Sequence, residues 1–546
     1  MRSLERQFIR AEINQRKEEG CNVEEISARI GHALNSNASD TDLETLYEEL
    51  IALPIDSAFP YVEPSDLDEI RSQRPDARRK PDQSNIEKTS EEDVLLDRIY
   101  GGWLGRVAGC TLGKPVEGWK KDRIDNFLKD NQELPLTDYF PFKEKWIAAA
   151  LRPSTRGHIE YMDRDDDIDF TIIGLIALER HGAGLTSRAM AYSWMENMPF
   201  RMVCTAEYAA YRNFAMDILP PESASYRNPF REWIGAQIRA DVFGYAAPGS
   251  PEKAAGLAYQ DAAVSHTKNG IYGEMFVAAM ISAAFNCESA EDIITAGLEE
   301  IPAKSRLAAA VRNTLAWCKE FDDWLDVWEK VNESLGHYHD VHTIKNAALV
   351  VLGVWYGEND FETGIMSTVR CGWDTDCTAA TVGSILGVKS GAAALPEKWV
   401  GVFNDRVKSA VSGHSDNRIS ELANRTFEVA KRIAAPAEKT KKIILGANVG
   451  GVWDLTCDWG HQTINFEQGT IDFINEERGE EVEPVDLRSS DYRHPHVSFS
   501  YAMDKGGWDF YIDFSGTVNG DQLEGFFNPG MTPVTGTRRV YSEKDV

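Results

Sequence analysis

The 546-residue sequence has no apolar run close to the ~20 residues that a membrane-spanning helix needs. Its first residues, Met1 to Arg6, lack the apolar core of a secretory signal. Its eight cysteines include no Cys-x-x-Cys pair, which argues against a disulfide framework or a zinc knuckle and favours a reducing compartment. We therefore expect a cytoplasmic protein with no membrane partner.

Basic residues are also scarce. Lys and Arg number 58 against 87 Asp and Glu, which gives a formal net charge of −29. This balance argues against a protein that holds nucleic acid through phosphate contacts. An anionic ligand would need local help from metal ions, helix N-termini or a few arginines.

The length of the chain predicts two or three domains. Residues 1–92 are predicted to form a helical arm and a charged linker, and the simplest interpretation is a lid or an oligomerisation arm without chemistry. Residues 93–436 are predicted to be mostly helical. In residues 441–546, alternating apolar residues and the turn Asn519-Gly520 predict an all-β domain, a small barrel or sandwich. The fold class is therefore mainly α, and the oligomeric state is left open.

Four glycines recur every fourth residue from Gly101 to Gly113. On a helix they lie in one stripe. Each glycine costs roughly 1 kcal/mol relative to alanine inside a helix. Four in register therefore predict that another backbone packs very close to this face. Beyond the stripe, Pro115 and Glu117 mark a helix end and a loop.

Two short acidic clusters, about two hundred residues apart, are the strongest chemical signal. The first is Asp165-Asp166-Asp167, and the second contains Asp374 and Asp376. Each leads into an apolar stretch typical of a helix, so its carboxylates face the positive end of a helix dipole. We hypothesise that the clusters meet and hold one or two oxygen-liganded cations, Mg²⁺, Mn²⁺ or Ca²⁺, which would remove their repulsion. The alternative for the first cluster is N-capping plus surface charge.

The other polar motifs are weaker. The loop 265–269, which contains His266, lies between apolar stretches and is interpreted as a pocket lining or as the site of a structural histidine. Arg239 belongs to a second polar patch in an apolar setting. Residues 337–342 lack the spacing of a zinc site, so we expect a loop in which His342 caps the next helix.

With these motifs in order, the chain resembles the ADP-ribosylglycohydrolase family over roughly residues 94–432. The residues that carry the resemblance are the glycine helix Gly101–Gly113 with Glu117 after it, the helix start Asp165-Asp166-Asp167, the motif Gly372-Trp373-Asp374-Thr375-Asp376, and the loop Ser265-His266. The resemblance implies an orthogonally packed all-α domain. It also implies cleavage of a glycosidic bond at the anomeric carbon of ADP-ribose.

The same resemblance implies a centre of two divalent cations, Mg²⁺ or Mn²⁺. The positions that match the family's metal-binding carboxylates are Asp166, Asp167, Asp374 and Asp376. Asp165 and Cys377 occupy positions where many members have threonines, and both are included among the predicted metal ligands.

We expect a metal-dependent hydrolase of ADP-ribose or a related glycoside, free or attached to protein. Bond cleavage builds positive charge on the ribose ring, which carboxylates stabilise while metal ions orient the ring and activate water. The predicted catalytic residues are Glu117, Asp167 and Asp374. The predicted substrate-binding residues are Ser265, His266, Asn269, Arg239 and Trp373. Two alternatives stay open: a hydrolase of another N- or O-glycoside, such as a nucleoside, furanoside or oligosaccharide, and a catalytically silent ADP-ribose-binding protein.

Overall fold

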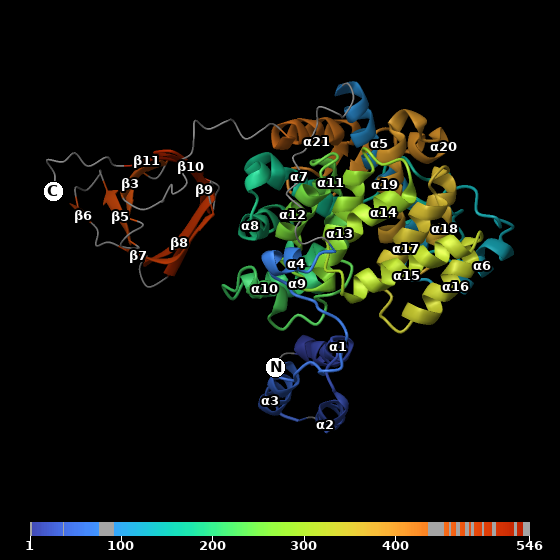
Figure 1. The fold of residues 1–546 in the computed structure, drawn as a ribbon, viewed down its shortest axis with the longest axis horizontal. Helices are drawn as coiled ribbons and strands as arrows, with labels where there is room; N and C mark the ends of the chain where they lie inside the picture. The colour runs from blue at the N-terminus through green and yellow to red at the C-terminus, as the bar shows by residue number, and fades with distance from the viewer. Residues whose placement is uncertain are drawn as a thin grey trace. The chain divides into compact units, whose positions relative to one another are not determined.

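The computed structural model describes residues 3–36, 38–75 and 92–434 and, between residues 452 and 538, the strands of a sheet with one turn. The chain divides into two compact units, Met1–Ala434 and Ala435–Val546. The first unit is helical and the second is a β-sheet (Figure 1). The predicted mainly α fold with a small C-terminal all-β domain is confirmed. The finer three-part division, with an arm of residues 1–92, stays a prediction.

The N-terminal arm belongs to the first unit and has a small core of its own. Its helices are α1 (Ser3–Glu18), α2 (Glu24–Asn35), α3 (Asp40–Ile51) and α4 (Leu67–Ser72). The apolar faces of α1, α2 and α3 meet in a cluster that includes Ile9, Ile30 and Leu50. The arm therefore holds itself together partly by burying its own side chains.

The rest of the first unit is a packed set of helices. In chain order they are α5 (Glu92–Gly113), α6 (Lys121–Asp130), α7 (Asp166–His181), α8 (Ser187–Asn197), α9 (Thr205–Phe214), α10 (Glu222–Ser225), α11 (Asp241–Tyr245), α12 (Pro251–Ala262), α13 (Asn269–Ala283), α14 (Ala290–Leu298), α15 (Arg306–Glu320), α16 (Trp324–Leu335), α17 (Thr343–Tyr356), α18 (Phe361–Arg370), α19 (Thr375–Ser390), α20 (Glu397–Val400) and α21 (Ile419–Ala434). A short hairpin, β1 (Arg406–Lys408) and β2 (Asp416–Arg418), precedes α21. Helices α7, α13 and α19 are buried over nearly their whole length and form the centre of the core.

The glycine stripe of α5 packs directly on the backbone of α19. The facing pairs are Gly101 with Gly387, Gly105 with Gly383, Gly109 with Ala379 and Gly113 with Thr375. A β-carbon at any of these α5 positions would overlap a carbonyl oxygen of α19. The predicted close approach of a second backbone is therefore confirmed. Its consequence is that the first turn of α19, which carries the second acidic cluster, lies beside the C-terminal end of α5.

The second unit is an antiparallel sheet. Its strands are β3 (Val452–Cys457), β4 (Gly460–Asn465), β5 (Thr470–Asn475), β6 (Glu480–Glu481), β7 (Val485–Arg493), β8 (His496–Asp504), β9 (Asp509–Asn519), β10 (Gln522–Asn528) and β11 (Thr532–Arg538). The order is β4-β3-β11-β10-β9-β8-β7-β5-β6, and β4 also pairs with β5, so the sheet closes on itself. Its buried apolar side chains include Trp453, Phe499 and Phe527. The turn that connects β9 to β10 consists of Gly520 and Asp521, one position after the predicted Asn519-Gly520, because Asn519 still pairs with Gln522.

Candidate metal centre

Three helix ends bring the two acidic clusters together. Asp165 caps the N-terminus of α7, where its carboxylate accepts a hydrogen bond from the Asp167 amide at 3.1 Å. Asp374 occupies the position before the first residue of α19. The hydroxyl of Thr375 donates to the carbonyl of Gly113, at the end of α5, at 2.9 Å. Both clusters therefore lie at the positive ends of helix dipoles, which favour negative charge.

Ligand atoms of the two clusters form two groups that share Asp376. Within each group, one oxygen or sulfur atom per residue lies within 4.8 Å of the others. The first group is Cys110, Asp165, Asp167 and Asp376, and the second is Asp374, Asp376 and Cys377. All of these residues are buried, whereas Asp166 is half-buried and Glu117 is exposed. Either group offers enough ligand atoms to hold a metal ion.

Two cationic side chains contact the clusters, but they supply fewer positive charges than the clusters have carboxylates. Lys114 lies 3.1 Å from Asp165. Arg106, buried in α5, lies 3.3 Å from Asp167 and 2.8 Å from Asp241, so its charge is divided between the two carboxylates. Asp376 has no ion pair with a Lys or Arg of the described chain. One of its carboxylate oxygens is buried without a hydrogen-bond partner in that part of the chain.

Burial and mutual repulsion raise the pKa of the clustered carboxylates. Loss of solvent is the largest cause for Asp167 and Asp376, whose pKa values are raised well above the usual range of an aspartate. Burial, with further repulsion from nearby carboxylates, raises the pKa of Asp374 to about 6. Glu117 is exposed, but the protein around its carboxylate displaces solvent, and this loss of solvent together with repulsion from Asp374 raises its pKa to about 7. Carboxylates in this condition gain most from a bound divalent cation, which stabilises their charged form.

The donor set fits a hard cation. Carboxylate oxygens predominate, as Mg²⁺ and Mn²⁺ prefer, and the unpartnered oxygen of Asp376 offers a free ligand position. The thiol of Cys377 donates a hydrogen bond to Asp167 at 3.2 Å, and burial raises its pKa well above the usual value. The sulfur is therefore a neutral thiol. Its predicted role as a metal ligand stays a prediction.

The loop that carries Glu117 is bound to the second acidic motif by its backbone. The Gly118 amide donates to the carbonyl of Trp373 at 2.8 Å, and the Trp373 amide donates to the carbonyl of Trp119 at 2.9 Å. Trp373 has a φ of 70°, an uncommon value for a residue with a side chain. Its ring is buried, and the Lys345 ammonium lies 3.8 Å from the ring centroid. Substrate contact by Trp373 stays a prediction.

Three of the other predicted substrate-binding residues share one buried network. Arg239 donates to the carboxylate of Asp261 and, at 2.8 Å, to the carbonyl of Gly235. It also donates to the hydroxyl of Ser265 at 3.3 Å, and this hydroxyl lies 2.8 Å from Nδ1 of His266. Nε2 of His266 is buried without a hydrogen-bond partner in the described part of the chain, and the predicted contact of these residues with substrate stays a prediction.

The remaining predicted substrate-binding residue, Asn269, joins a different set of partners. Its amide group donates to Glu232 at 2.9 Å and accepts from the backbone of Leu307 at 3.0 Å. Asn269 therefore connects α13 to α15, and its contact with substrate also stays a prediction. Elsewhere, the predicted cap is confirmed, since Nδ1 of His342 accepts from the backbone of Ile344 at the start of α17.

Sequence reasoning missed two residues at the centre, Arg106 and Cys110. They lie four positions apart on α5, so they project from one face of that helix. The feature of the sequence that could have revealed them was Arg106 itself. It is a lone charge inside a run of glycine and apolar residues, and a charge buried there requires a carboxylate partner.

The helical unit and its buried acidic centre define a class of all-α protein. In this class the N-termini of helices bring together carboxylates that are suited to bind divalent cations. The chain belongs to the ADP-ribosylglycohydrolase family, whose family model, described as ADP-ribosylglycohydrolase, matches residues 91–435. An uncharacterized protein of Archaeoglobus fulgidus is 28% identical over 350 residues, which cover 60% of this chain and 96% of that protein.

A solved structure titled "ADP-ribosylglycohydrolase-related protein complex" is 16% identical, with a TM-score of 0.40. The match covers 63% of this chain and 99% of that chain. In the described part of the chain, no helix has the length and apolar character needed to cross a membrane.

Proposed function

We propose that the protein is a metal-dependent hydrolase that cleaves the glycosidic bond of ADP-ribose conjugates with a binuclear Mg²⁺ or Mn²⁺ centre. The observation that carries the proposal is the pair of buried ligand groups that share Asp376. Family membership supports an ADP-ribose-type substrate. We assign the reaction to residues 93–436, with the arm 1–92 and the β domain 441–546 as additions to that catalytic domain.

The carboxylates of the two clusters would hold the cations. These ligands are Asp165, Asp166, Asp167, Asp374 and Asp376. Bound divalent cations supply Lewis acidity, orient hydroxyl oxygens and make a bound water more acidic. Cleavage of a ribosyl bond builds positive charge on the ring, and buried carboxylates at the same place stabilise that charge.

Glu117 is the proposed proton carrier. It is exposed on a loop that the backbone of Trp373 holds beside the second cluster. In the metal-free protein its pKa is raised to about 7, by loss of solvent and by repulsion from Asp374. A group in this condition can donate a proton to a leaving group and accept one from water. Asp167 and Asp374 stay the further proposed catalytic carboxylates.

Release of ADP-ribose from an ADP-ribosylated protein tests the proposal. We expect release in Mn²⁺ or Mg²⁺, loss in EDTA, and recovery when the cation is restored. Asp376→Asn should lower the rate by at least about 100-fold, because it removes the ligand that both groups share. Circular dichroism should show that this variant keeps the helical fold.

A panel of nucleosides, furanosides and oligosaccharides run beside the ADP-ribosylated protein separates the alternatives. Turnover of a panel member without release of ADP-ribose would assign the centre to another glycoside. Tight ADP-ribose binding by calorimetry without any product would identify a silent binding protein. Full activity in EDTA, with no metal detected in the protein, would overturn the metal mechanism.

A further inference from the structure

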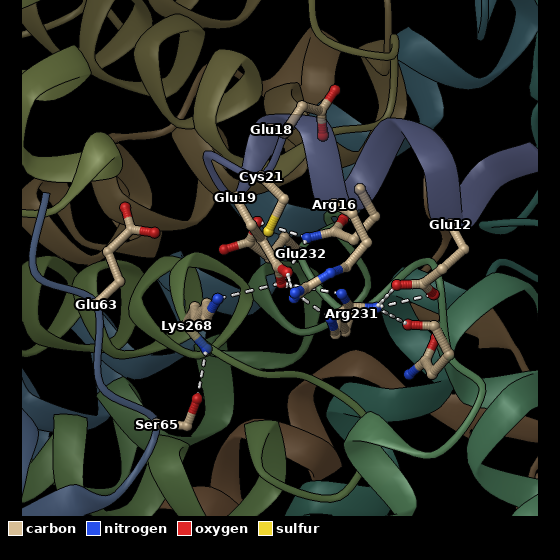
Figure 2. Close-up of polar contacts among 12 residues, drawn as sticks. Glu12, Arg16, Glu18, Glu19, Cys21, Glu63, Ser65, Arg231, Glu232 and Lys268 are labelled. Carbon is tan, nitrogen blue, oxygen red and sulfur yellow. Dashed lines mark hydrogen bonds and ion pairs between the residues drawn. The ribbon is translucent and has the colours of Figure 1, made fainter. Parts of the chain in front are cut away.

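Helix α1 is docked on the rest of the first unit by buried charged side chains (Figure 2). Glu12 of α1 and Glu19, which directly follows α1, flank the guanidinium of Arg231, at 2.8 Å and 3.0 Å. Lys268 also approaches Glu19, at 3.3 Å. All but Lys268 are buried. A buried guanidinium held between two carboxylates cannot move away without leaving charges unpaired, so these contacts restrict Arg231 strongly.

The next residue, Glu232, is restricted in the same way. Gln15 of α1 donates to its carboxylate at 2.7 Å. Arg306 donates to both oxygens of that carboxylate at 2.7 Å, and Glu63, which follows the arm's helices α1 to α3, pairs with Arg306 at 2.7 Å. The arm therefore fixes the first two residues of the segment 231–238.

The other end of this segment contacts the metal centre. Ile234 and Ile238 pack against Cys377 in one apolar cluster. The carbonyl of Ile238 accepts a hydrogen bond from Arg106, which also donates to the carbonyl of Asp167 at 2.6 Å. Contacts therefore run without a gap from Glu12 and Glu19, through residues 231–238, to a predicted metal ligand.

Two simpler roles for the arm explain less. A solvating or oligomerisation arm would keep its charges at the surface, whereas Glu12 and Glu19 are buried inside the chain. The second role is simple attachment of the arm to the rest of the unit. Another ion pair already provides this attachment, since the buried Arg74, which follows α4, pairs with Glu300 at 2.6 Å and with Glu252 at 3.0 Å. Neither role requires ion pairs with residues 231–238, the segment that contacts Cys377 and Arg106.

We propose that α1 is a positioning element of the metal centre. Glu12 and Glu19 hold Arg231, and this keeps the Ile234–Ile238 face against Cys377 and the Ile238 carbonyl on Arg106. Arg231 is thus a positioning residue, since it acts on the ligands through its neighbours. The inference rests on the proposed function, because it assigns the arm a part in holding that function's cations. Coupling of this kind requires a contiguous set of packed and hydrogen-bonded groups, which the segment supplies.

The test is Mn²⁺ binding by calorimetry to the full-length chain. The variant is Glu12→Gln/Glu19→Gln, which removes two charges and preserves shape. Its dissociation constant for Mn²⁺ should rise about tenfold, as for other residues that orient metal ligands from behind. The matched control is Glu300→Gln, which also breaks a buried ion pair of the arm but does not touch Arg231. This control should bind Mn²⁺ as tightly as the wild type.

Circular dichroism at the titration temperature checks that each variant is folded. If the double variant does not fold, Glu12→Gln alone carries the same expectation, because Arg231 is the ion-pair partner of Glu12. Unchanged Mn²⁺ affinity in a folded variant, or an equal loss in Glu300→Gln, would overturn the inference. A wild-type protein that binds no Mn²⁺ would instead overturn the proposed function.

Discussion

The metal centre and the α1 interface both bury several carboxylates, yet their charges are balanced differently. At the interface, Glu19 meets Arg231 and Lys268, and these cations lower the pKa of Glu19 to about 2 despite its burial. At the metal centre, Asp376 meets other carboxylates, and burial raises its pKa well above the usual value. Burial is the largest cause in both places, so the supply of cationic side chains decides the direction of the shift.

This difference distinguishes carboxylates that stabilise the fold through ion pairs from carboxylates that are suited to bind a cation from solution. Where the chain provides its own guanidinium groups, the buried charge is neutralised on folding. Where it provides too few, the negative charge must be neutralised by protons or by a cation from solution. Four changes would break or sharpen this contrast.

The largest expected effect is at the interface. Arg231→Met leaves Glu12 and Glu19 buried without their main cation, and it should lower the free energy of unfolding by about 3–5 kcal/mol. Urea unfolding measures the change. In the matched variant, Glu12→Gln and Glu19→Gln accompany Arg231→Met, and most of the stability should return because no unpaired charge remains. Equal loss in both variants would show that the charges are not balanced as described.

The second prediction concerns the metal centre. Mn²⁺ at about 100 times its dissociation constant should raise the free energy of unfolding by about 2.7 kcal/mol. Asp376→Asn should lose this gain, and without metal it should be more stable than the wild type, because it removes a buried and poorly compensated carboxylate. Thermal unfolding with and without Mn²⁺ measures both effects. A less stable metal-free variant would contradict the contrast between the two regions.

The third prediction concerns how the metal centre is assembled. Gly109→Ala places a β-carbon on the Ala379 carbonyl and should lower the free energy of unfolding by about 1–3 kcal/mol, as overpacking does. The matched control is Gly31→Ala in α2, where nothing lies within 4 Å of the added carbon. That change should instead raise stability by about 0.5–1 kcal/mol through helix propensity. Urea unfolding measures both variants, and loss of stability in both would contradict the close contact of α5 with α19.

The smallest expected effect is the pH dependence of Glu18 in α1. Burial, followed by repulsion from Glu232, raises its pKa from 4.5 to about 7. A raised carboxyl pKa means that the folded protein holds the proton more tightly, so this stabilisation is full below pH 4.5 and is lost as the pH rises through 7. Glu18→Gln should match the wild type at pH 4.5 and exceed it by about 1 kcal/mol at pH 8.

Geometry supports the same substitution. The carboxylate of Glu18 lies 3.5 Å from Nε2 of His342. Because Nδ1 of this ring accepts from Ile344, Nε2 carries the hydrogen and can donate it to the side-chain carbonyl oxygen of a glutamine. Urea unfolding at the two pH values measures the effect, with Glu25→Gln as the exposed control on α2. A gain that is equal at both pH values would assign the effect to the amide contact rather than to the charge.

Local patterns determined much of the architecture. The four-residue spacing from Gly101 to Gly113 predicted the close helix contact, because side-chain period and size are local properties of a helix. The polar loop before Thr343 predicted the cap by His342, since capping joins residues only two or three positions apart. Alternating apolar residues predicted the all-β domain for the same reason, whereas the choice between a barrel and a sandwich was left open.

The amino-acid sequence by itself determined which residues carry charge and where helices and strands begin. Only the tertiary structure decided which charges meet. Glu12 and Arg231, 219 positions apart, became partners, while Asp376 was left with other carboxylates. The physical reason is that a carboxylate is the same group in both places. Its pKa, its partner and its use depend on neighbours that come from distant parts of the chain, and no local spacing encodes them.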